Sequence, residues 1–301
     1  MGQALSPGNR FFSAFEGAVL MATLIELSNP ARLREKEEHL FAILGRMGRV
    51  IVAFSGGTDS AYLGWAANRV LGANALAVTA DSASLPESHK RDAEEFVKRF
   101  GMAHEYIQTF EFDNPDYVRN DPNRCFHCKD ELFTRLEQVG RERGYEHIVY
   151  GVNLDDLGDY RPGQGAAKKH QVEAPLADAR LTKAEIRELS RLGDLPTWDR
   201  PASACLSSRI PYGTAVTIDN VKTVETGEEQ LKALGFRQFR VRFHGEVVRI
   251  EIAREEMEKA LTLEMAQRFT EIFKGLGFKY VTLDLEGYRQ GSLNEVLGLK
   301  R

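Results

Sequence analysis

A short polar run in this 301-residue chain carries residue types that suit phosphate chemistry. It is Ser55-Gly56-Gly57-Thr58-Asp59-Ser60, and it lies between an apolar segment at 50–54 and a helix-forming segment at 59–71. Its glycines let the backbone approach a ligand closely, and its hydroxyls are hydrogen-bond donors. A helix that begins near Asp59 directs its free N–H groups and the positive end of its dipole at the run. The sequence therefore predicts an anion site suited to phosphate.

Two common nucleotide-binding motifs do not match this run, which lacks both the GK[ST] ending of the P-loop and the G-x-G-x-x-G of the dinucleotide folds. The run resembles instead the PP-loop of the ATP pyrophosphatases. That resemblance implies that the loop grips the β,γ-pyrophosphate of ATP, which leaves while AMP is transferred to a substrate oxygen. The ATP-binding residues that it implies in the loop are Ser55, Gly56, Gly57, Thr58, Asp59 and Ser60. A strand-to-helix turn without a ligand is the alternative.

The three cysteines are the second feature that suggests chemistry. Cys125 and Cys128 form a Cys-x-x-Cys pair in a predicted polar loop before a helix, and Cys205 lies far along the chain. An odd number of cysteines without an export signal disfavours a disulfide framework. A redox pair fits poorly because the pair does not follow the first strand, and zinc usually needs a fourth ligand. Three thiolates suit a four-iron cluster with one open iron. Three unrelated thiols are the alternative.

Composition limits the remaining function classes. The chain has 40 Lys and Arg against 44 Asp and Glu, so its net charge of -4 gives no indication of nucleic acid or an anionic membrane as a partner. Its length and its 43% of hydrophobic residues allow a sizeable core and suggest about two domains. No apolar run approaches the ~20 residues of a membrane span, and no signal peptide is convincing. We expect a cytoplasmic protein.

Hydrophobic patterning predicts how these residues are positioned. Apolar segments at 50–54, 75–80 and 148–152, with a weaker one at 104–107, alternate with helical patterns at 31–47, 59–71, 86–100 and 130–143. This alternation predicts a doubly wound α/β domain: a parallel sheet, covered by helices on both faces, with ligands at the carboxyl ends of its strands.

The polar segment 151–163 follows one of these strands and is expected to face the loop at 55–60. We expect Gly151 and Asn153 to adjoin ATP. Asp155 and Asp156, together with Asp59, fit a magnesium site beside the nucleotide. A solvated polar turn is the alternative.

From residue 211 the pattern changes to a helix at 216–234, strands at 239–243 and 247–252, a long helix at 255–276 and a last strand at 280–285. This order predicts a small α+β domain with a mostly antiparallel sheet. We therefore divide the chain into a loose extension at 1–28, an α/β domain at 29–210 that holds the PP-loop, and the α+β domain at 211–301.

Six segments together resemble the LarE family: 55–60, 123–129, 151–163, 201–209, 240–245 and 284–294. Many ligases share the first, whereas the other five in this order are specific. The resemblance implies a PP-loop fold of the adenine nucleotide alpha hydrolase type. It also implies an ATP-dependent sulfur transferase, which adenylates a carboxylate of pyridinium-3,5-biscarboxylic acid mononucleotide and displaces AMP with sulfur. The thiocarboxylate product serves the nickel-pincer cofactor of lactate racemase.

The same resemblance implies cofactors and site residues. Family members with a single cysteine, at the position of Cys205, sacrifice its sulfur, whereas members with three hold a 4Fe-4S cluster. This chain has three, which favours a cluster on Cys125, Cys128 and Cys205 beside ATP and Mg²⁺. Thr58 stands where Val is commoner in the family, and we expect its hydroxyl to be tolerated. The substrate's phosphate and carboxylates favour arginine donors. The candidates for substrate binding are Ser208, Arg209, Arg242 and Arg289. Family members are hexameric, so we expect a homo-oligomer; the sulfur donor is not identified.

Four alternatives stay open. A PP-loop tRNA thiolase predicts a basic face and an RNA-binding appendage, and the sequence indicates neither. A PP-loop synthetase that uses ammonia leaves the three cysteines unexplained. A single-turnover enzyme would sacrifice Cys205 itself. A nucleotide-binding or iron–sulfur sensor would bind ATP without releasing AMP and pyrophosphate.

Overall fold

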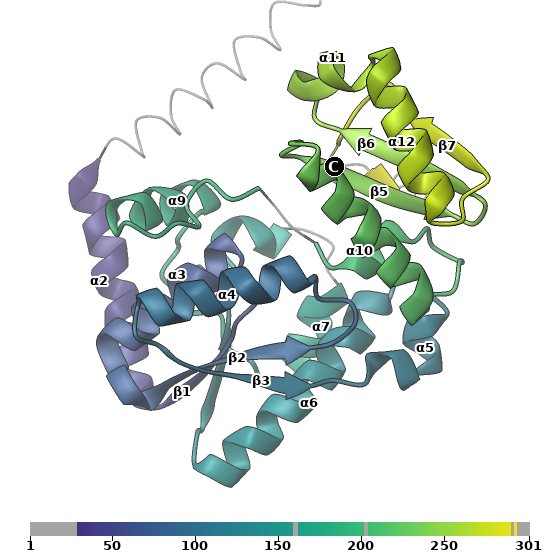
Figure 1. Ribbon diagram of the computed structural model, residues 1–301. Coiled ribbons are helices and arrows are strands. Elements are labelled where there is room, and N and C mark those ends of the chain that lie inside the picture. The colour runs from purple at the N-terminus through teal and green to yellow at the C-terminus, as the bar shows by residue number, and fades with distance from the viewer. Residues whose placement is uncertain (1–28, 159–161, 202–203, 290–291, 294–301) are drawn as a thin grey trace, which may run out of the picture.

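A four-stranded parallel sheet forms the larger part of the molecule. The computed structural model describes residues 29–158, 162–201, 204–289 and 292–293, so the predicted extension at 1–28 lies outside the described residues. The strands are β1 (Val50–Ala53), β2 (Ala75–Asp81), β3 (Ala103–Gln108) and β4 (His147–Tyr150), in the order β3-β2-β1-β4 (Figure 1). All three pairings are parallel. The predicted doubly wound α/β fold is confirmed.

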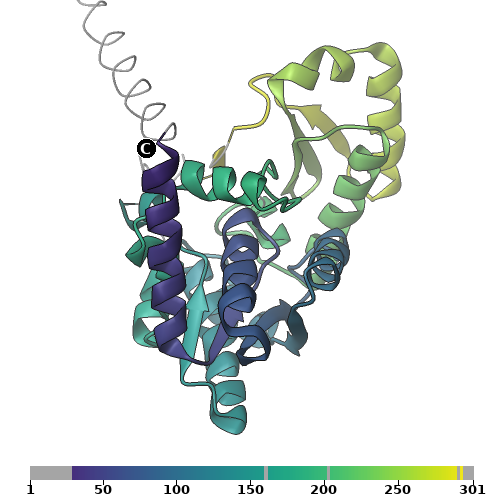
Figure 2. The same cartoon turned by 90° about the vertical axis from the view of Figure 1, so that its left-hand side faces the viewer.

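Helices cover both faces of this sheet because successive strand residues point in opposite directions. Val50 and Val52 enter one core, while Ile51 and Ala53 enter the other. The helices that pack into the first core are α2 (Pro30–Met47), α3 (Thr58–Leu71), α4 (Glu87–Arg99), α8 (Pro175–Asp178) and α9 (Lys183–Leu192). The second core is covered by α6 (Arg124–Arg143) and α7 (Pro162–Lys169). Figure 2 shows the two layers of helices edge-on.

The strand order places a crevice beside β1. The chain passes from β1 to β2 and β3 on one side and then crosses to β4 on the other side. Loops that leave the carboxyl ends of β1 and β4 therefore diverge, which is where open α/β sheets bind ligands. The PP-loop follows β1 and the polar segment that begins at Gly151 follows β4, so both leave the same edge of the sheet.

A second sheet lies on the side toward which β2 and β3 point (Figure 1). It contains β5 (Phe239–His244), β6 (Val247–Ile252) and β7 (Tyr280–Leu283), with α10 (Ile218–Ala233) packed against it. β5 and β6 are antiparallel, whereas β6 and β7 are parallel. The sheet is therefore mixed rather than mostly antiparallel, because a helical crossover between β6 and β7 returns the chain in the same direction.

The helix predicted at 255–276 is divided in the structure. A 3₁₀ turn, η6 (Arg254–Glu256), leads into the short α11 (Met257–Ala260), and α12 (Leu263–Gly275) then begins separately. Thr262 has extended backbone angles, and its side chain accepts a hydrogen bond from Met265 N. An N-cap of this kind starts a new helix, and this explains the break.

The C-terminal core also takes in residues from the first part of the chain. Tyr117 of α5 (Pro115–Val118), Leu206 of η5 (Leu206–Arg209) and Ile210 pack among its apolar side chains. The two sheets are thus joined through α5 and the segment around Cys205. The domain boundary at 210 stays a prediction. Among the described residues, no helix is long and apolar enough to span a membrane.

Packing of α10 against α12 yields a stability prediction at Gly227. A Cβ at this position would lie 2.6 Å from Phe273 Cε1, a fully buried ring, so Gly227→Ala forces the two helices apart. We expect urea denaturation to show a loss of roughly 1–3 kcal/mol in the free energy of unfolding. Gly275→Ala is the matched control: it meets no atom within 4 Å and gains helix propensity. Equal effects of the two substitutions would contradict this packing.

Candidate active site

The PP-loop is held in shape by glycine geometry and by its own hydroxyls. Gly56 has a φ of 70°, which favours glycine, and Gly57 is the extended N-cap of α3. Ser60 Oγ accepts a hydrogen bond from Ser55 N at 3.2 Å and lies 2.9 Å from Ser55 Oγ. The first N–H groups of α3 consequently face the crevice, and this arrangement suits an oligophosphate.

Thr58 has a partner that the sequence pattern does not reveal. Its side chain is buried, and Oγ1 donates a hydrogen bond of 2.9 Å to Thr197 O. The hydroxyl therefore attaches the first turn of α3 to the segment that leads to Cys205. This bond explains how a polar side chain is accommodated there.

Asp59 meets a lysine that is not among the residues predicted from the sequence. A capping box between Thr182 and Glu185 places Lys183 at the first position of α9. Lys183 Nζ lies 2.6 Å from Asp59 Oδ2, and Lys183 N donates to Asp155 Oδ2 at 2.8 Å. Lys183 therefore connects the PP-loop with the segment after β4. Sequence spacing gives no signal for this contact because it joins residues that are far apart in the chain.

One carboxylate oxygen is suited to act as a ligand of the expected magnesium ion. Asp59 Oδ1 is buried and makes no hydrogen bond within the described residues. Magnesium is usually bound by one or two carboxylates together with substrate phosphates, so this single oxygen suits a nucleotide-bound ion. Asp155 is exposed, and Asp156 Oδ2 accepts a hydrogen bond from Asn153 N at 3.2 Å. Their roles as magnesium ligands stay predictions.

Gly151 lies against the start of α3, whereas the hydrogen bonds of Asn153 are local, and contact of either residue with ATP stays a prediction. A Cβ on Gly151 would lie 2.7 Å from Ser60 N, so the end of β4 touches the backbone of α3 directly. Asn153 Oδ1 accepts hydrogen bonds from Asp155 N at 2.9 Å and Asp156 N at 3.3 Å. Gly151 thus permits the close approach, and Asn153 shapes the turn that follows.

The cysteine pair lies inside a helix rather than in the polar loop predicted before it. α6 already begins at Arg124, because the turn at Asp121–Arg124 feeds straight into the helix. Cys125 and Cys128 are three residues apart on this helix and therefore share one side of it. Cys205 precedes the short helix η5.

The electrostatics show that the three thiols lie near one another. Desolvation and then the charges of neighbours that include Cys205 raise the pKa of Cys128. Desolvation of the thiol and the charge of Cys205 also raise the pKa of Cys125, although the residue as a whole is exposed. The described part of the chain holds no group of three or more His, Cys, Asp or Glu arranged to bind a metal ion. The cluster therefore stays a prediction.

A buried network fixes the segment around Cys205. Arg124 Nη1 donates to Ser207 O at 2.8 Å, and Tyr117 Oη lies 2.6 Å from Ser207 Oγ. Arg209 Nη1 donates to Ala204 O at 2.7 Å and to Cys205 O at 3.0 Å. The helix that carries the cysteine pair and the carbonyls beside Cys205 are consequently held in a fixed relation.

The predicted substrate-binding residues lie in two places. Arg209 is 2% exposed and pairs with Glu228 through two bonds of 2.8 and 3.0 Å. Arg242 is buried, and its Nη1 donates to Ser208 O at 3.0 Å, while Ser208 Oγ donates to Cys205 O. These residues thus support the Cys205 segment. Arg289 pairs with Glu286 at 2.8 Å, near the end of the described chain. Contact of all four with substrate stays a prediction.

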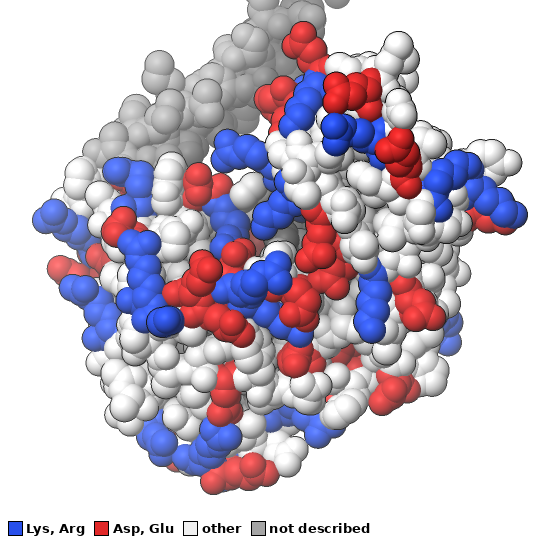
Figure 3. All heavy atoms as spheres, in the orientation of Figure 1, with Lys and Arg blue, Asp and Glu red and all other residues white. Residues whose placement is uncertain are grey.

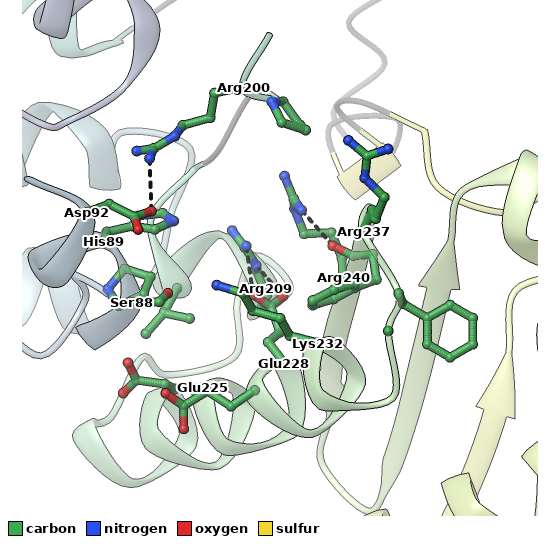
Figure 4. Close-up of a pocket in the computed structure, with 17 residues that line it drawn as sticks. Ser88, His89, Asp92, Arg200, Arg209, Glu225, Glu228, Lys232, Arg237 and Arg240 are labelled. Atoms are coloured by element: carbon green, nitrogen blue, oxygen red, sulfur yellow. Dashed lines mark hydrogen bonds and ion pairs between the residues drawn. The ribbon is translucent and has the colours of Figure 1, made fainter. Parts of the chain in front are cut away.

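Two adjoining cavities lie between the PP-loop, the cysteines and the second sheet. The first, of about 180 Å³, is lined by Ser55, Gly56 and Gly57 of the PP-loop and by Cys128 and Cys205. The second, of about 480 Å³, opens between the two sheets and is shown in Figure 4. The residues that line both are Pro86, His89 and Arg200. Nucleotide-binding residues and two thiols thus face one space.

Several residues of the larger cavity are not predicted from the sequence. Burial, followed by the charges of Arg200 and Arg209, lowers the pKa of His89 to about 4, so the imidazole is neutral near pH 7. Burial and the charge of Arg209 lower the pKa of Arg240 to about 10. In Figure 4 Arg200 lies at one edge of this cavity with its guanidinium turned toward Asp92, and Arg209 and Arg240 also line the cavity. A cavity with several cations suits a substrate that carries phosphate or carboxylate groups.

Comparisons with known proteins agree with this geometry. Residues 44–143 match the family model described as NAD synthase. The chain is 35% identical to the pyridinium-3,5-bisthiocarboxylic acid mononucleotide synthase of Lactiplantibacillus plantarum over 274 residues, covering 89% of this chain and 96% of that protein. The chain belongs to the PP-loop ATP pyrophosphatase family. The family binds ATP, so this chain is an ATP-utilising enzyme. That the loop at 55–60 holds the nucleotide stays a prediction.

Two further relatives of this PP-loop protein differ in how much is known of them. The uncharacterized protein slr1717 of Synechocystis sp. is 43% identical over 265 residues, which cover 88% of this chain and 99% of that protein. One of the polypeptides that form the glutamine-hydrolyzing GMP synthase of Archaeoglobus fulgidus is 28% identical over 204 residues, which cover 62% of this chain and 63% of that polypeptide. The shorter match to the GMP synthase is consistent with the PP-loop fold being common to several reactions.

The close approach at Gly151 generates a prediction about the expected ATP site. Because its Cβ would meet the backbone of α3, Gly151→Ala displaces the first turn of the helix that faces the phosphates. We expect ATP affinity, measured by calorimetry, to fall by roughly tenfold or more, since small displacements of binding groups are costly. Gly158→Ala, which meets no atom within 4 Å, serves as the control and should bind ATP normally. Unchanged affinity in Gly151→Ala would show that the two backbones need not touch.

Proposed function

We propose that this PP-loop enzyme is an ATP-dependent sulfur transferase that acts on pyridinium-3,5-biscarboxylic acid mononucleotide. It adenylates a carboxylate of this substrate and replaces AMP with sulfur, and the thiocarboxylate serves the nickel-pincer cofactor of lactate racemase. The observation that carries the proposal is the cavity lined both by the PP-loop and by Cys128 and Cys205. The relative in L. plantarum, named as a synthase of the bisthiocarboxylic acid mononucleotide, supports the substrate.

The first half-reaction uses the PP-loop. A carboxylate oxygen of the substrate attacks the α-phosphorus of ATP, an O–P bond forms, and the bond from the α-phosphorus to the bridging oxygen breaks. The N–H groups at the start of α3 stabilise the charge that develops on the departing pyrophosphate. Asp59 Oδ1 would hold the Mg²⁺ that neutralises part of this charge. Lys183, paired with Asp59, adds a positive charge at the same place.

The second half-reaction uses the cysteines. When Cys205 is the donor, its Sγ attacks the acyl carbon of the adenylate, and AMP leaves with the electrons of the acyl C–O bond. Loss of the Cα proton then breaks the Cβ–Sγ bond of Cys205, which releases the thiocarboxylate and leaves dehydroalanine. Cys205 faces the cavity of the PP-loop, so a sulfur atom at this position lies beside the nucleotide. The segment around it is held by Arg209 and Arg124, which keeps the thiol directed at the same space.

We propose an iron–sulfur cluster because three cysteines are present that could ligate it. The three thiols lie on two adjoining segments, and desolvation raises the pKa of the Cys125 and Cys128 thiols. Their arrangement in the described chain is not a finished metal site, so binding requires the thiols to move together. When bound, a 4Fe-4S cluster would supply sulfur repeatedly, whereas Cys205 alone would supply it once.

The charge distribution favours a small-molecule substrate. On the face shown in Figure 3, acidic and basic side chains of the described residues alternate around the hollow between the two sheets. The cavity is lined by charges of both signs: Glu225, Glu228 and Lys232 from α10, and Arg240 from β5 (Figure 4). A nucleic acid binds best to a continuous positive surface, whereas a mononucleotide needs only a few cations in a cavity.

Replacing Cys205 tests whether adenylation and sulfur transfer are separate steps that use different residues. With ATP, Mg²⁺ and pyridinium-3,5-biscarboxylic acid mononucleotide, Cys205→Ser should still release pyrophosphate but should form no thiocarboxylate by mass spectrometry. Asp59→Asn is the complementary variant and should lose pyrophosphate release, because it removes the charge that holds the metal. Thiocarboxylate formation at the normal rate by Cys205→Ser would refute a sulfur-transferring role for this cysteine.

Iron and sulfide analysis of protein purified without oxygen shows whether the sulfur comes from a cluster or from Cys205 itself. About four irons per chain support the cluster. Absence of iron, with Cys205 converted to dehydroalanine after one turnover, would establish the sacrificial route instead. Release of neither AMP nor pyrophosphate with this substrate would contradict the proposed reaction.

A further inference from the structure

Arg200 lies in a backbone segment that is fixed from two directions. The segment joins α9 to Cys205, and Arg187 of α9 donates hydrogen bonds of 2.8 Å to both Trp198 O and Arg200 O. Thr58 Oγ1, at the start of α3, holds Thr197 O from the other side. The position of Arg200 is therefore set by the helix that carries Lys183 and by the helix that follows the PP-loop.

The guanidinium of Arg200 touches the PP-loop itself. Nη1 donates to Gly56 O at 2.9 Å, and Nη2 lies 3.0 Å from Asp92 Oδ2 on α4. The side chain is 26% exposed, so it is shielded by protein but open to the cavities. Figure 4 shows it reaching toward Asp92 and His89 at the edge of the larger cavity. A guanidinium offers five donors in a planar fork, which matches the geometry of a phosphate.

Arg200 also stands at the boundary between the two cavities. Three of the described residues line both cavities: Pro86, His89 and Arg200. Pro86 has no charge, and His89 is neutral near pH 7. The positive charge that these three place at the boundary therefore belongs to Arg200.

The chemistry of adenylyl transfer requires a phosphate at this boundary. The PP-loop takes the β- and γ-phosphates, and the acceptor carboxylate enters from the larger cavity between the sheets. The α-phosphate must then lie between them, since it is bonded first to the pyrophosphate and afterwards to the acceptor. It carries negative charge in ATP, in the transition state and in the acyl-adenylate, so a cation at this point assists both half-reactions.

We propose that Arg200 binds the α-phosphate of ATP and of the acyl-adenylate, turning part of its guanidinium from Gly56 O to the phosphate oxygens. The inference rests on the proposed function for the identity of the acceptor only. During transfer the carboxylate O–P bond forms and the bond to the bridging oxygen breaks. Arg200 remains protonated throughout and exchanges no proton with the substrate.

Measuring the binding of AMP, ATP and inorganic pyrophosphate tests whether Arg200 contacts the α-phosphate, and it needs no acceptor substrate. For Arg200→Ala we expect calorimetry to show that AMP and ATP bind roughly tenfold or more weakly, as expected for loss of a charge-assisted hydrogen bond. Inorganic pyrophosphate should bind as it does to the unaltered protein, because it fills the PP-loop and has no α-phosphate. Arg200→Lys, which keeps the charge but not the fork, should bind AMP with intermediate affinity.

Asp92→Asn is the matched control. It breaks the same ion pair while leaving the guanidinium in place, so AMP affinity should not fall. Equal losses for AMP and pyrophosphate in Arg200→Ala would show that Arg200 merely supports the PP-loop, and unchanged AMP affinity would exclude the contact. If Arg200→Ala fails to fold, the comparison of AMP with pyrophosphate in Arg200→Lys decides in the same way.

The role of Arg200 and the proposed function can fail independently of each other. A selective loss of AMP affinity together with no thiolation of the pyridinium mononucleotide would retain the role of Arg200 and reject the substrate. Thiolation by the unaltered protein together with unaltered AMP affinity in Arg200→Ala would retain the substrate and reject the role of Arg200.

Discussion

The ion pair between Arg209 and Glu228 is the interaction on which the geometry of the candidate site depends. Arg209 is almost completely buried, and its guanidinium joins α10 to the carbonyls of Ala204 and Cys205. Burial alone would raise the pKa of Glu228, but the charge and hydrogen bonds of Arg209 lower it. Removing one partner from a buried pair costs roughly 3–5 kcal/mol because the other charge is left unpaired. The segment that carries Cys205 therefore keeps its place only while the second sheet is docked.

This dependence gives the second sheet a function in the site beyond closing the cavity. Arg242 on β5 donates to Ser208 O and pairs with the fully buried Glu251 of β6. Two strands of the second sheet thus reach the same short segment that α10 holds through Arg209. The PP-loop, in contrast, is built entirely from the first sheet and its helices. The PP-loop and the segment that carries Cys205 consequently rest on separate frameworks, which meet at residues 197–200 and 204–209.

The sequence pattern was sufficient for most of the fold because local periodicity determines which segments are strands and helices. The parallel sheet and its covering helices follow from that periodicity. The direction of β7 could not be predicted in this way, since it depends on where the chain returns after α12. Likewise, the start of α6 at Arg124 reflects a turn whose stability comes partly from the bond to Ser207 O, far along the chain.

Sequence motifs identified individual residues of the candidate site, but they did not indicate which other residues these contact. Gly151 was predicted to adjoin ATP; this contact stays a prediction, and the structure shows at Gly151 a close approach to the backbone of α3. No binding motif points to Lys183 or Arg200, because what singles them out is what folding places next to them: Asp59 for one, Gly56 O for the other. Arg209 was predicted as a substrate ligand, and the structure adds contacts with Glu228, Ala204 O and Cys205 O that sequence spacing does not indicate.

The position of the cysteines explains how one cavity can serve two different steps. The first step stabilises hard phosphate oxygens, which needs backbone N–H groups, cations and a magnesium ion. The second needs a soft nucleophile, which phosphate-binding groups cannot provide. Cys205 lines the same cavity as the PP-loop, and desolvation raises the pKa of the Cys125 and Cys128 thiols, which disfavours their nucleophilic thiolate form. In the reaction that we propose, adenylation precedes sulfur transfer, because the acyl carbon becomes a target only after AMP is attached.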